Sequence, residues 1–271
     1  MTGLQAFVVA VILGVVEGLT EFLPISSTGH LIVTGHLLNY TGRQASAFEV
    51  FIQLGAILAV VWIYRVPLGG AAAGLFRGRP ESWQLAVNLL LGFLPAGVVG
   101  LLAHRAIKAY LFNPESVAVV LMAGGVGIWA VEAGKPAART SGIDAITPVT
   151  ALGIGFAQCL SLVPGVSRAA ATILGGMLLG LDRTTATVYS FYLAIPTMLA
   201  ASTFDLLKVW WSLTAADLAG FAVGFVVAFL AAVVSVRFLL RYVATHDFKP
   251  FAYYRIVLGA LALVYFLLAR A

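Results

Sequence analysis

Two acidic side chains lie four residues apart in the apolar stretch GVVEGLTEFLPISSTGHLIVTGHL, residues 14–37. On a helix, Glu17 and Glu21 project from the same face, so their carboxylates can converge on one ligand, metal ion or proton. Ionisable groups are costly in apolar surroundings and usually serve a function there. The pair therefore predicts a binding or catalytic site.

A proline separates the acids from a second group of polar residues. Pro24 ends the first helix, and Ser26, Ser27 and Thr28 stand where a second helix would begin, as natural N-cap residues. Free backbone N–H groups at a helix start favour an anion, above all a phosphate. His30 falls one turn inside this second helix. The break therefore predicts a site for a phosphate ester.

A divalent cation, Mg²⁺ or Ca²⁺, is expected at the same site, with Glu17 and Glu21 as its ligands. The competing interpretation is a kinked helix with capping residues and a satisfied polar network. Ser26 or Thr28 alone would fit that interpretation equally well, because hydroxyls cap helices routinely. The paired acids fit it poorly.

The composition places the whole chain in a membrane. Of its 271 residues, 61% are hydrophobic and 10% are charged, and the mean hydropathy is +1.02. Soluble domains do not have such a composition. We therefore predict a single membrane domain over residues 1–271, with no cleavable signal peptide and no nucleic acid partner. The single cysteine, Cys159, excludes an intramolecular disulfide and a cysteine-based metal site.

Six segments are long and apolar enough to cross a bilayer, which takes about 20 residues each. They lie near residues 48–64, 83–103, 115–132, 186–205, 215–237 and 251–269. Two further apolar regions, 4–37 and 147–181, are each interrupted by a polar stretch that contains proline. Their halves are too short to cross alone. We therefore predict an all-α integral membrane protein with six transmembrane helices and two re-entrant helix hairpins. The alternative for the first region is one or two true spans.

The two interrupted regions resemble each other. Gly14-x-x-Glu17-x-Leu19 with Pro24-x-x-Ser27 matches Gly155-x-x-Gln158-x-Leu160 with Pro164-x-x-Ser167, after a slip of one residue. Three predicted spans separate the copies, so the second hairpin would come from the opposite side of the membrane. We predict inverted-topology repeats, about 1–132 and 147–271, whose broken helices meet near the bilayer midplane.

The distribution of Lys and Arg predicts the orientation. The loops at 65–82, 133–146, 182–185 and 237–250 are richer in these residues than the loops at the other end. The positive-inside rule places that richer side in the cytoplasm. The first hairpin then enters from outside, and we expect a multi-pass protein of the bacterial plasma (inner) membrane whose site opens to the periplasmic side.

Residues 158–172, QCLSLVPGVSRAAAT, form the second polar break. Pro164 and Gly165 predict a tight turn, and Ser167 can cap the helix that follows. Arg168 places a permanent charge in the membrane region, and its guanidinium suits the oxygens of a pyrophosphate. The alternative role of Arg168 is a salt bridge to a glutamate of the first break. Thr172, one turn on, can supply another hydroxyl.

The two breaks together resemble the undecaprenyl-pyrophosphate phosphatase family, the bacitracin-resistance type, over essentially the whole chain. One motif is E-x-x-x-E leading into FLPISSTGH. The other is P-G-x-S-R-S-x-x-T, from which this chain departs at Ala169, where the family has a serine. We expect that serine to be dispensable. The segment FEVFIQLGAILAV, with Glu49 and Gln53, is also similar to the family, although Glu49 equally suits an interfacial acid.

The resemblance implies hydrolysis of undecaprenyl pyrophosphate to undecaprenyl phosphate and inorganic phosphate, which recycles the lipid carrier of cell-wall synthesis and confers bacitracin resistance. Such chemistry needs positioning and charge neutralisation. The nucleophile stays open between Ser27 with His30 as its base, His30 itself, and a water activated by a glutamate. The expected catalytic residues are Glu17, Glu21, Ser27, His30 and Arg168. Substrate binding is expected from Ser26, Thr28, Gly165, Ser167, Arg168 and Thr172.

Two other classes compete with the phosphatase. Paired broken helices also serve secondary transporters, so a transporter or flippase for a polyprenyl phosphate is the alternative. A purely structural subunit would leave the polar cluster unexplained. Gly124, Gly125 and Gly127 can pack helices within one chain or between two, and we expect a homodimer. Six polar residues near span ends are interpreted as solvated interface groups: His36, His104, Glu115, Glu132, Asp205 and His246.

Overall fold

The computed structural model describes residues 3–111, 113–209 and 215–269, and most of these residues are helical. Among them there is one isolated β-bridge and no β-strand. Within these residues, six helices are long and apolar enough to cross a membrane, and they confirm the six predicted spans. They are α3 (Arg43–Ile63), α5 (Pro80–Tyr110), α6 (Pro114–Gly134), α9 (Arg183–Val209), α10 (Ala215–Val243) and α11 (Lys249–Leu268). The predicted class, an all-α membrane protein, is therefore confirmed.

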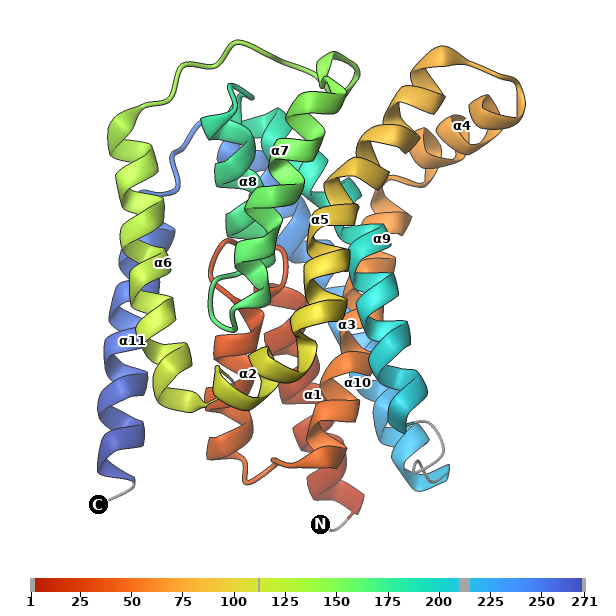
Figure 1. Ribbon diagram of the computed structural model, residues 1–271. Coiled ribbons are helices and arrows are strands. Elements are labelled where there is room, and N and C mark those ends of the chain that lie inside the picture. Colours follow the sequence, from red (N-terminus) through yellow and green to blue (C-terminus); the bar gives the residue numbers. More distant parts are fainter. Residues whose placement is uncertain (1–2, 112, 210–214, 270–271) are drawn as a thin grey trace.

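Each of the two interrupted regions forms a pair of short helices. The first holds α1 (Gly3–Thr20) and α2 (Ser27–Leu37), and the second holds α7 (Pro148–Gln158), the 3₁₀ turn η2 (Cys159–Leu162) and α8 (Arg168–Leu178). In Figure 1 the α1–α2 pair lies in the lower half of the bundle and the α7–α8 pair in the upper half, with their turns near the middle. Re-entry from the two faces of a bilayer and the inverted repeat stay predictions.

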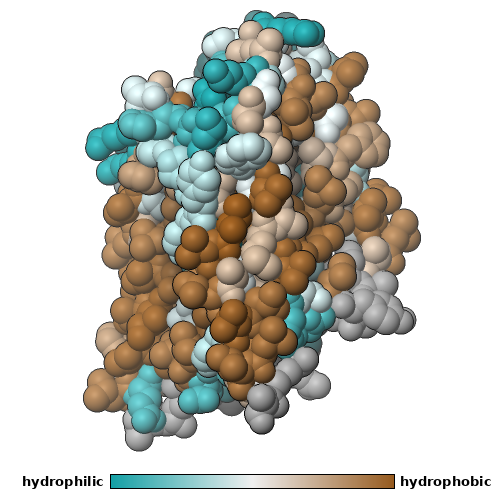
Figure 2. Space-filling view, turned by 90° about the vertical axis from the view of Figure 1, so that its left-hand side faces the viewer, coloured by the Kyte–Doolittle hydropathy of each residue, from teal (hydrophilic) through white to brown (hydrophobic). Residues whose placement is uncertain are grey.

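The outer surface is apolar over most of its height. Figure 2 shows a broad hydrophobic band, with hydrophilic residues gathered mainly at the upper end. Large apolar side chains of the spanning helices are exposed, among them Leu90, Val126, Leu230, Val257 and Leu261. Exposed apolar surface on this scale is expected only where lipid replaces water as the solvent.

Small residues bring the helices close together inside the chain. A Cβ on Gly18 of α1 would lie 2.3 Å from the carbonyl oxygen of Ala228 in α10. A Cβ on Gly125 of α6 would lie 2.8 Å from the carbonyl oxygen of Ala252 in α11. Close backbone approach of this kind is typical of membrane helices. Gly125 therefore packs within one chain, and the expected homodimer gains no support from it.

One helix was missed by the sequence analysis. Residues 65–82 were treated as a loop, but α4 (Arg65–Phe76) forms there and projects from the upper end of the bundle (Figure 1). Its glycines and Pro67 argue against a helix from propensity alone. Pro67 lies in the first turn, however, where a missing N–H costs little. A 3₁₀ turn, η1 (Ile143–Ala145), was also not expected.

The interpretation of Glu132 as a solvated interface group is wrong. Its side chain is buried, and its two oxygens accept hydrogen bonds from Nε and Nη2 of Arg183 at 2.9 and 2.5 Å. The Phe248 N–H donates to the same carboxylate at 3.0 Å. Glu132 therefore joins α6 to α9 and to the start of α11. Of the other residues in that group, His36 and His246 are exposed, and the side chain of His104 lies outside the described residues.

We expect Arg183→Ala to destabilise the protein by about 3 kcal/mol, because it leaves the buried Glu132 carboxylate without its paired cation. Thermal unfolding of the purified protein in detergent measures the effect. Arg241→Ala is the matched control, since Arg241 is an exposed arginine at the same end of the bundle. Equal melting temperatures for the two variants would show that the ion pair adds nothing.

Candidate active site

An ion pair joins the two broken regions. Glu21 directly follows α1, and Arg168 is the first residue of α8. Nη2 of Arg168 lies 3.1 Å from Oε1 of Glu21, and both side chains are almost completely buried. The salt bridge considered as the alternative role of Arg168 is thus present. The two residues are 147 positions apart in the sequence, so the fold itself assembles this contact.

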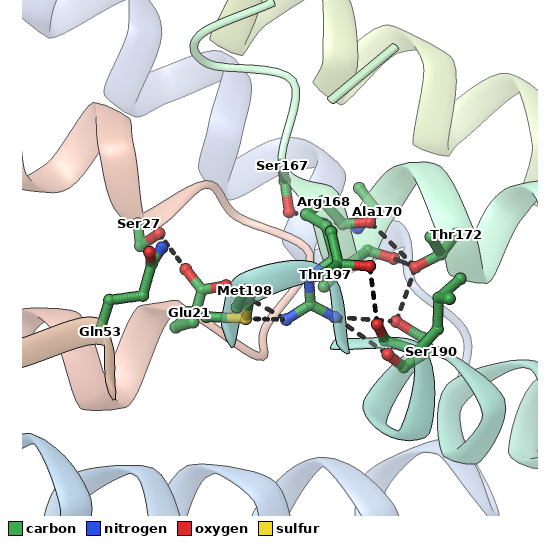
Figure 3. A network of polar contacts seen from close by, with 12 residues as sticks. Glu21, Ser27, Gln53, Ser167, Arg168, Ala170, Thr172, Ser190, Thr197 and Met198 are labelled. Carbon is green, nitrogen blue, oxygen red and sulfur yellow. Dashed lines mark hydrogen bonds and ion pairs between the residues drawn. The ribbon is translucent and has the colours of Figure 1, made fainter. Parts of the chain in front are cut away.

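Glu21 also holds the first hydroxyl of the following helix. The Ser27 hydroxyl donates to Oε2 of Glu21 at 2.5 Å. Figure 3 shows the carboxylate between Ser27 on one side and the guanidinium of Arg168 on the other. One carboxylate therefore orients a group from each broken region.

Residues of α9 fix the guanidinium of Arg168. Its Nη1 donates to the carbonyl and the hydroxyl oxygens of Ser190 at 3.1 and 3.3 Å, and Nη2 lies 3.3 Å from Sδ of Met198. The hydroxyl of Thr172 contacts that of Ser190 at 2.6 Å and donates to the carbonyl of Arg168 at 2.9 Å. Thr172 was expected to bind substrate. Its hydroxyl supports Arg168 and Ser190 (Figure 3), and its substrate-binding role stays a prediction.

Both breaks contain a serine in a strained backbone conformation. Ser26 precedes α2 with φ 70° and ψ 95°, and Ser167 precedes α8 with φ 75° and ψ 118°. Positive φ in residues other than glycine is rare and clusters at functional sites. The Ser167 hydroxyl caps α8 by accepting from the Ala170 N–H at 3.2 Å, as predicted. Ser26 makes no such cap, so the first N–H groups of α2 keep their capacity to donate.

Several buried polar atoms around the breaks have no partner. Among the described residues four such side-chain atoms occur, and three belong to the breaks: Oε1 of Glu17, Oγ of Ser26 and Nε of Arg168. Buried polar groups are almost always hydrogen-bonded, and unsatisfied ones are costly. The open hydroxyl and the open cationic donor are complementary to an anionic ligand, and the open carboxylate oxygen is complementary to a cation or a proton donor.

His30 is turned away from the hydroxyl of Ser27. Its Nδ1 donates to the carbonyl of Ser26, and its Nε2 lies 2.7 Å from the hydroxyl of Tyr254 in α11. The Ser27 hydroxyl bonds Glu21 instead. Thr28 lies beside Ser27, half-buried in the first turn of α2. The geometry therefore places a carboxylate, not the imidazole, next to the Ser27 hydroxyl.

The turn of the second break has the predicted form. Gly165 has φ +98°, and a Cβ there would meet the carbonyl oxygen of Val117 at 2.9 Å, so a side chain is excluded on both grounds. Ala169, where the family pattern has serine, is fully buried in α8. Ser190 supplies a hydroxyl to Arg168 from a different helix.

The residues fit a divalent cation in part. Within the described residues, no three Asp, Glu, His or Cys side chains group as they would in a cage built from protein ligands alone. Glu17 and Glu21 nevertheless offer two carboxylates, one with an unpartnered oxygen. Magnesium is commonly held by one or two carboxylates together with substrate phosphates and water. The pair fits that kind of site.

The sequence analysis missed the contributions of the spanning helices. Ser190 and Met198 come from α9, as does Phe191, which packs against Phe22. The centroid of the Phe22 ring lies 5.5 Å from Cζ of Arg168. Gln53, noted only by resemblance, accepts a hydrogen bond from Ser202 and extends toward the same cluster (Figure 3). A serine or a methionine in an apolar span carries no signal by itself, so periodicity alone does not reveal these residues.

The fold and the site define a multi-pass membrane protein with a buried, charged site where two broken-helix regions meet.

Residues 10–261 match the family model described as bacitracin resistance protein BacA, and the chain belongs to this family. It is 53% identical to the undecaprenyl-diphosphatase of Methylobacillus flagellatus over 262 residues, covering 95% of this chain and 97% of that protein. It is 52% identical to undecaprenyl-diphosphatase 1 of Paraburkholderia xenovorans over 260 residues, covering 94% and 93%. The undecaprenyl-diphosphatase of Laribacter hongkongensis is 53% identical over 254 residues, covering 94% and 93%.

Proposed function

We propose that this protein hydrolyses undecaprenyl pyrophosphate to undecaprenyl phosphate and inorganic phosphate. The observation that carries the proposal is the Glu21 carboxylate, which holds the Ser27 hydroxyl on one oxygen and the Arg168 guanidinium on the other. A nucleophile, a proton acceptor and an anion-binding cation thus stand in contact. The names of relatives about half identical to this chain agree with this chemistry.

The pyrophosphate binds between the two breaks. Arg168 contributes its charge and its open Nε, and the hydroxyl of Ser26 is available to a phosphate oxygen. Helices α2 and α8 both begin at this point, so the free N–H groups and the positive dipole ends at their N-termini favour an anion. The prenyl chain lies against the apolar outer surface, which explains why a charged site is built inside a membrane domain.

The reaction proceeds through Ser27. Its Oγ attacks the terminal phosphorus while the proton passes to Oε2 of Glu21, and the bond to the bridging oxygen breaks to release undecaprenyl phosphate. Water then attacks the phosphoserine, and Glu21 returns the proton to the departing Oγ as inorganic phosphate forms. Arg168 neutralises the charge on the transferred group throughout. His30, held by Tyr254, fixes the first turn of α2.

A divalent cation, Mg²⁺ or Ca²⁺, would be held by Glu17 and Glu21. When bound, it would neutralise charge on the pyrophosphate oxygens. The open Oε1 of Glu17 supports this assignment, because it is buried without a partner and a bound cation would supply one.

The protein lies in the plasma membrane of a bacterium, and its site opens to the periplasmic side. This orientation rests on the richer supply of Lys and Arg in the loops at 65–82, 133–146, 182–185 and 237–250. Hydrolysis there returns the lipid carrier of cell-wall synthesis to its monophosphate form. The description of the matching family, bacitracin resistance protein, agrees with this role.

The test is phosphate release from undecaprenyl pyrophosphate by the purified protein in detergent, with chelator and after Mg²⁺ or Ca²⁺ is restored. We expect release that chelator abolishes and that one of the ions recovers. Lipid binding without release under either ion would overturn the phosphatase and favour a polyprenyl-phosphate carrier. A carrier needs charge complementarity but no hydroxyl bonded to a carboxylate.

Replacing Glu17 should weaken the cation site and leave the Ser27–Glu21 contact intact. We expect Glu17→Gln to raise the Mg²⁺ concentration for half-maximal activity by about tenfold or more, equivalent to about 1.4 kcal/mol of binding free energy. Titration of activity with Mg²⁺ measures the shift. Glu81→Gln, which changes an exposed acid of α5, is the control. An unchanged titration for Glu17→Gln would remove Glu17 from the metal site.

A further inference from the structure

The largest fully buried side chain among the described residues is an arginine outside both breaks. Arg255 lies on α11 and is 0% exposed. Its guanidinium donates to three backbone segments. Nη2 bonds the carbonyl of Gly165 at 2.8 Å, Nη1 bonds those of Val166 at 2.8 Å and Pro24 at 3.2 Å, and Nε bonds that of Leu121 at 3.2 Å.

Arg255 has no carboxylate partner in the part of the chain that the structure describes. A buried cation held only by neutral groups is expensive, so a purely stabilising role would be better served by an apolar side chain. Three of the four carbonyls that Arg255 satisfies belong to turn residues, which have no helical partner of their own inside an apolar bundle. The fourth, that of Leu121, lies within α6.

The three turn carbonyls belong to the two turns that carry the site. Pro24 stands three residues before Ser27, and Gly165 and Val166 stand directly before the cap and first residue of α8. The planar guanidinium reaches both turns at once, which a single ammonium point charge cannot do with the same geometry. The neighbouring Tyr254 bonds His30, so two successive residues of α11 hold the first break.

We propose that Arg255 is a positioning residue that holds the turn at 21–26 in register with the turn at 163–167, and so sets Ser27 and Glu21 against Arg168. The inference rests on the proposed phosphatase function. All the hydrogen bonds of the Arg255 guanidinium go to backbone carbonyls, so it acts through the turns and not by touching substrate. Displacements of about 1 Å between reacting groups can cost about 10² in rate.

The surroundings provide a second way to disturb this contact. A Cβ on Gly124 of α6 would lie 2.0 Å from Nη2 of Arg255, so Gly124→Ala must displace the guanidinium from its carbonyls. Gly127, one turn along the same helix, has open space around it. Gly124→Ala and Gly127→Ala are therefore matched substitutions that differ in their effect on Arg255.

The experiment measures kcat and KM for undecaprenyl pyrophosphate with wild type, Arg255→Gln, Arg255→Lys, Gly124→Ala and Gly127→Ala, each normalised to folded protein by thermal unfolding. We expect kcat per folded molecule to fall about 10²-fold in Arg255→Gln and Arg255→Lys, with KM changed less than about threefold. Gly124→Ala should lower kcat about tenfold, and Gly127→Ala should match wild type.

A lower melting temperature with an unchanged kcat per folded molecule would make Arg255 merely structural and overturn the proposal. If the Arg255 variants do not fold, the comparison of Gly124→Ala with Gly127→Ala decides, and equal kcat values there would also overturn it. Absence of phosphate release from wild type is a different result, because it contradicts the phosphatase itself.

Discussion

Replacing Arg168 by glutamine is expected to lower kcat/KM for undecaprenyl pyrophosphate by about 10³-fold. Glutamine keeps a hydrogen-bonding end but removes the charge that faces the transferred phosphate, and one such donor contributes about 10² to 10³ in rate. Loss of the paired hydrogen bonds to an anion adds to the effect. The guanidinium is also the contact between the second break and Glu21, so its removal separates the two halves of the site.

A lysine at position 168 is not expected to restore the activity that Arg168 supports. It keeps the charge but has no planar fork to reach Glu21, Ser190 and Met198 together, so we expect Arg168→Lys to lose about 10²-fold. Steady-state phosphate release gives both values. Arg237→Gln, which changes an exposed arginine of α10, is the control and should match wild type. Near-wild-type activity in Arg168→Gln would exclude Arg168 from transition-state binding.

Glu21→Gln is expected to lower kcat by about 10² to 10³-fold and to change KM little. The amide retains the size of the carboxylate but cannot accept the proton of Ser27, and general base catalysis is worth about 10² to 10⁴. The substitution also removes the negative partner of Arg168, which leaves that cation free to bind the anionic substrate. The loss should therefore be in the chemical step.

The split between kcat and KM separates this role from a metal-binding one. If Glu21 acted only as a cation ligand, raising Mg²⁺ would restore the rate of Glu21→Gln, as we expect for Glu17→Gln. We expect no recovery at saturating Mg²⁺. Recovery to within about threefold of wild type would assign Glu21 to the metal alone and leave Ser27 without its proton acceptor. Glu81→Gln again serves as the control for removal of an acid.

Much of the fold could be predicted from the sequence because lipid imposes simple rules. Six uninterrupted apolar segments predicted six spans, and all six are present. The polar breaks were equally visible, since paired acids and clustered hydroxyls are rare in apolar segments. The α4 helix was missed because its glycines lower helix propensity, and Glu132 was misassigned because its partner Arg183 lies on another helix.

The site could be predicted only where local sequence carries it. Ser27, Glu21 and Arg168 stood out as polar residues in the breaks, and the structure brings them into contact. Ser190 and Met198 could not be found in this way, because only packing of α9 brings them to Arg168. Arg255 did carry a signal, as an arginine inside a predicted span, and the sequence analysis did not use it.

We propose that both breaks build one phosphatase site, and a double-mutant cycle tests this proposal most directly. Phosphate release is measured for wild type, Glu21→Gln, Arg168→Gln and the double variant under the same Mg²⁺ concentration. Residues that act as a unit lose little more together than singly. We predict that the double variant keeps the residual rate of Arg168→Gln within about tenfold. A rate lowered by the product of the two single effects would contradict the claim and place Glu21 and Arg168 in separate functions.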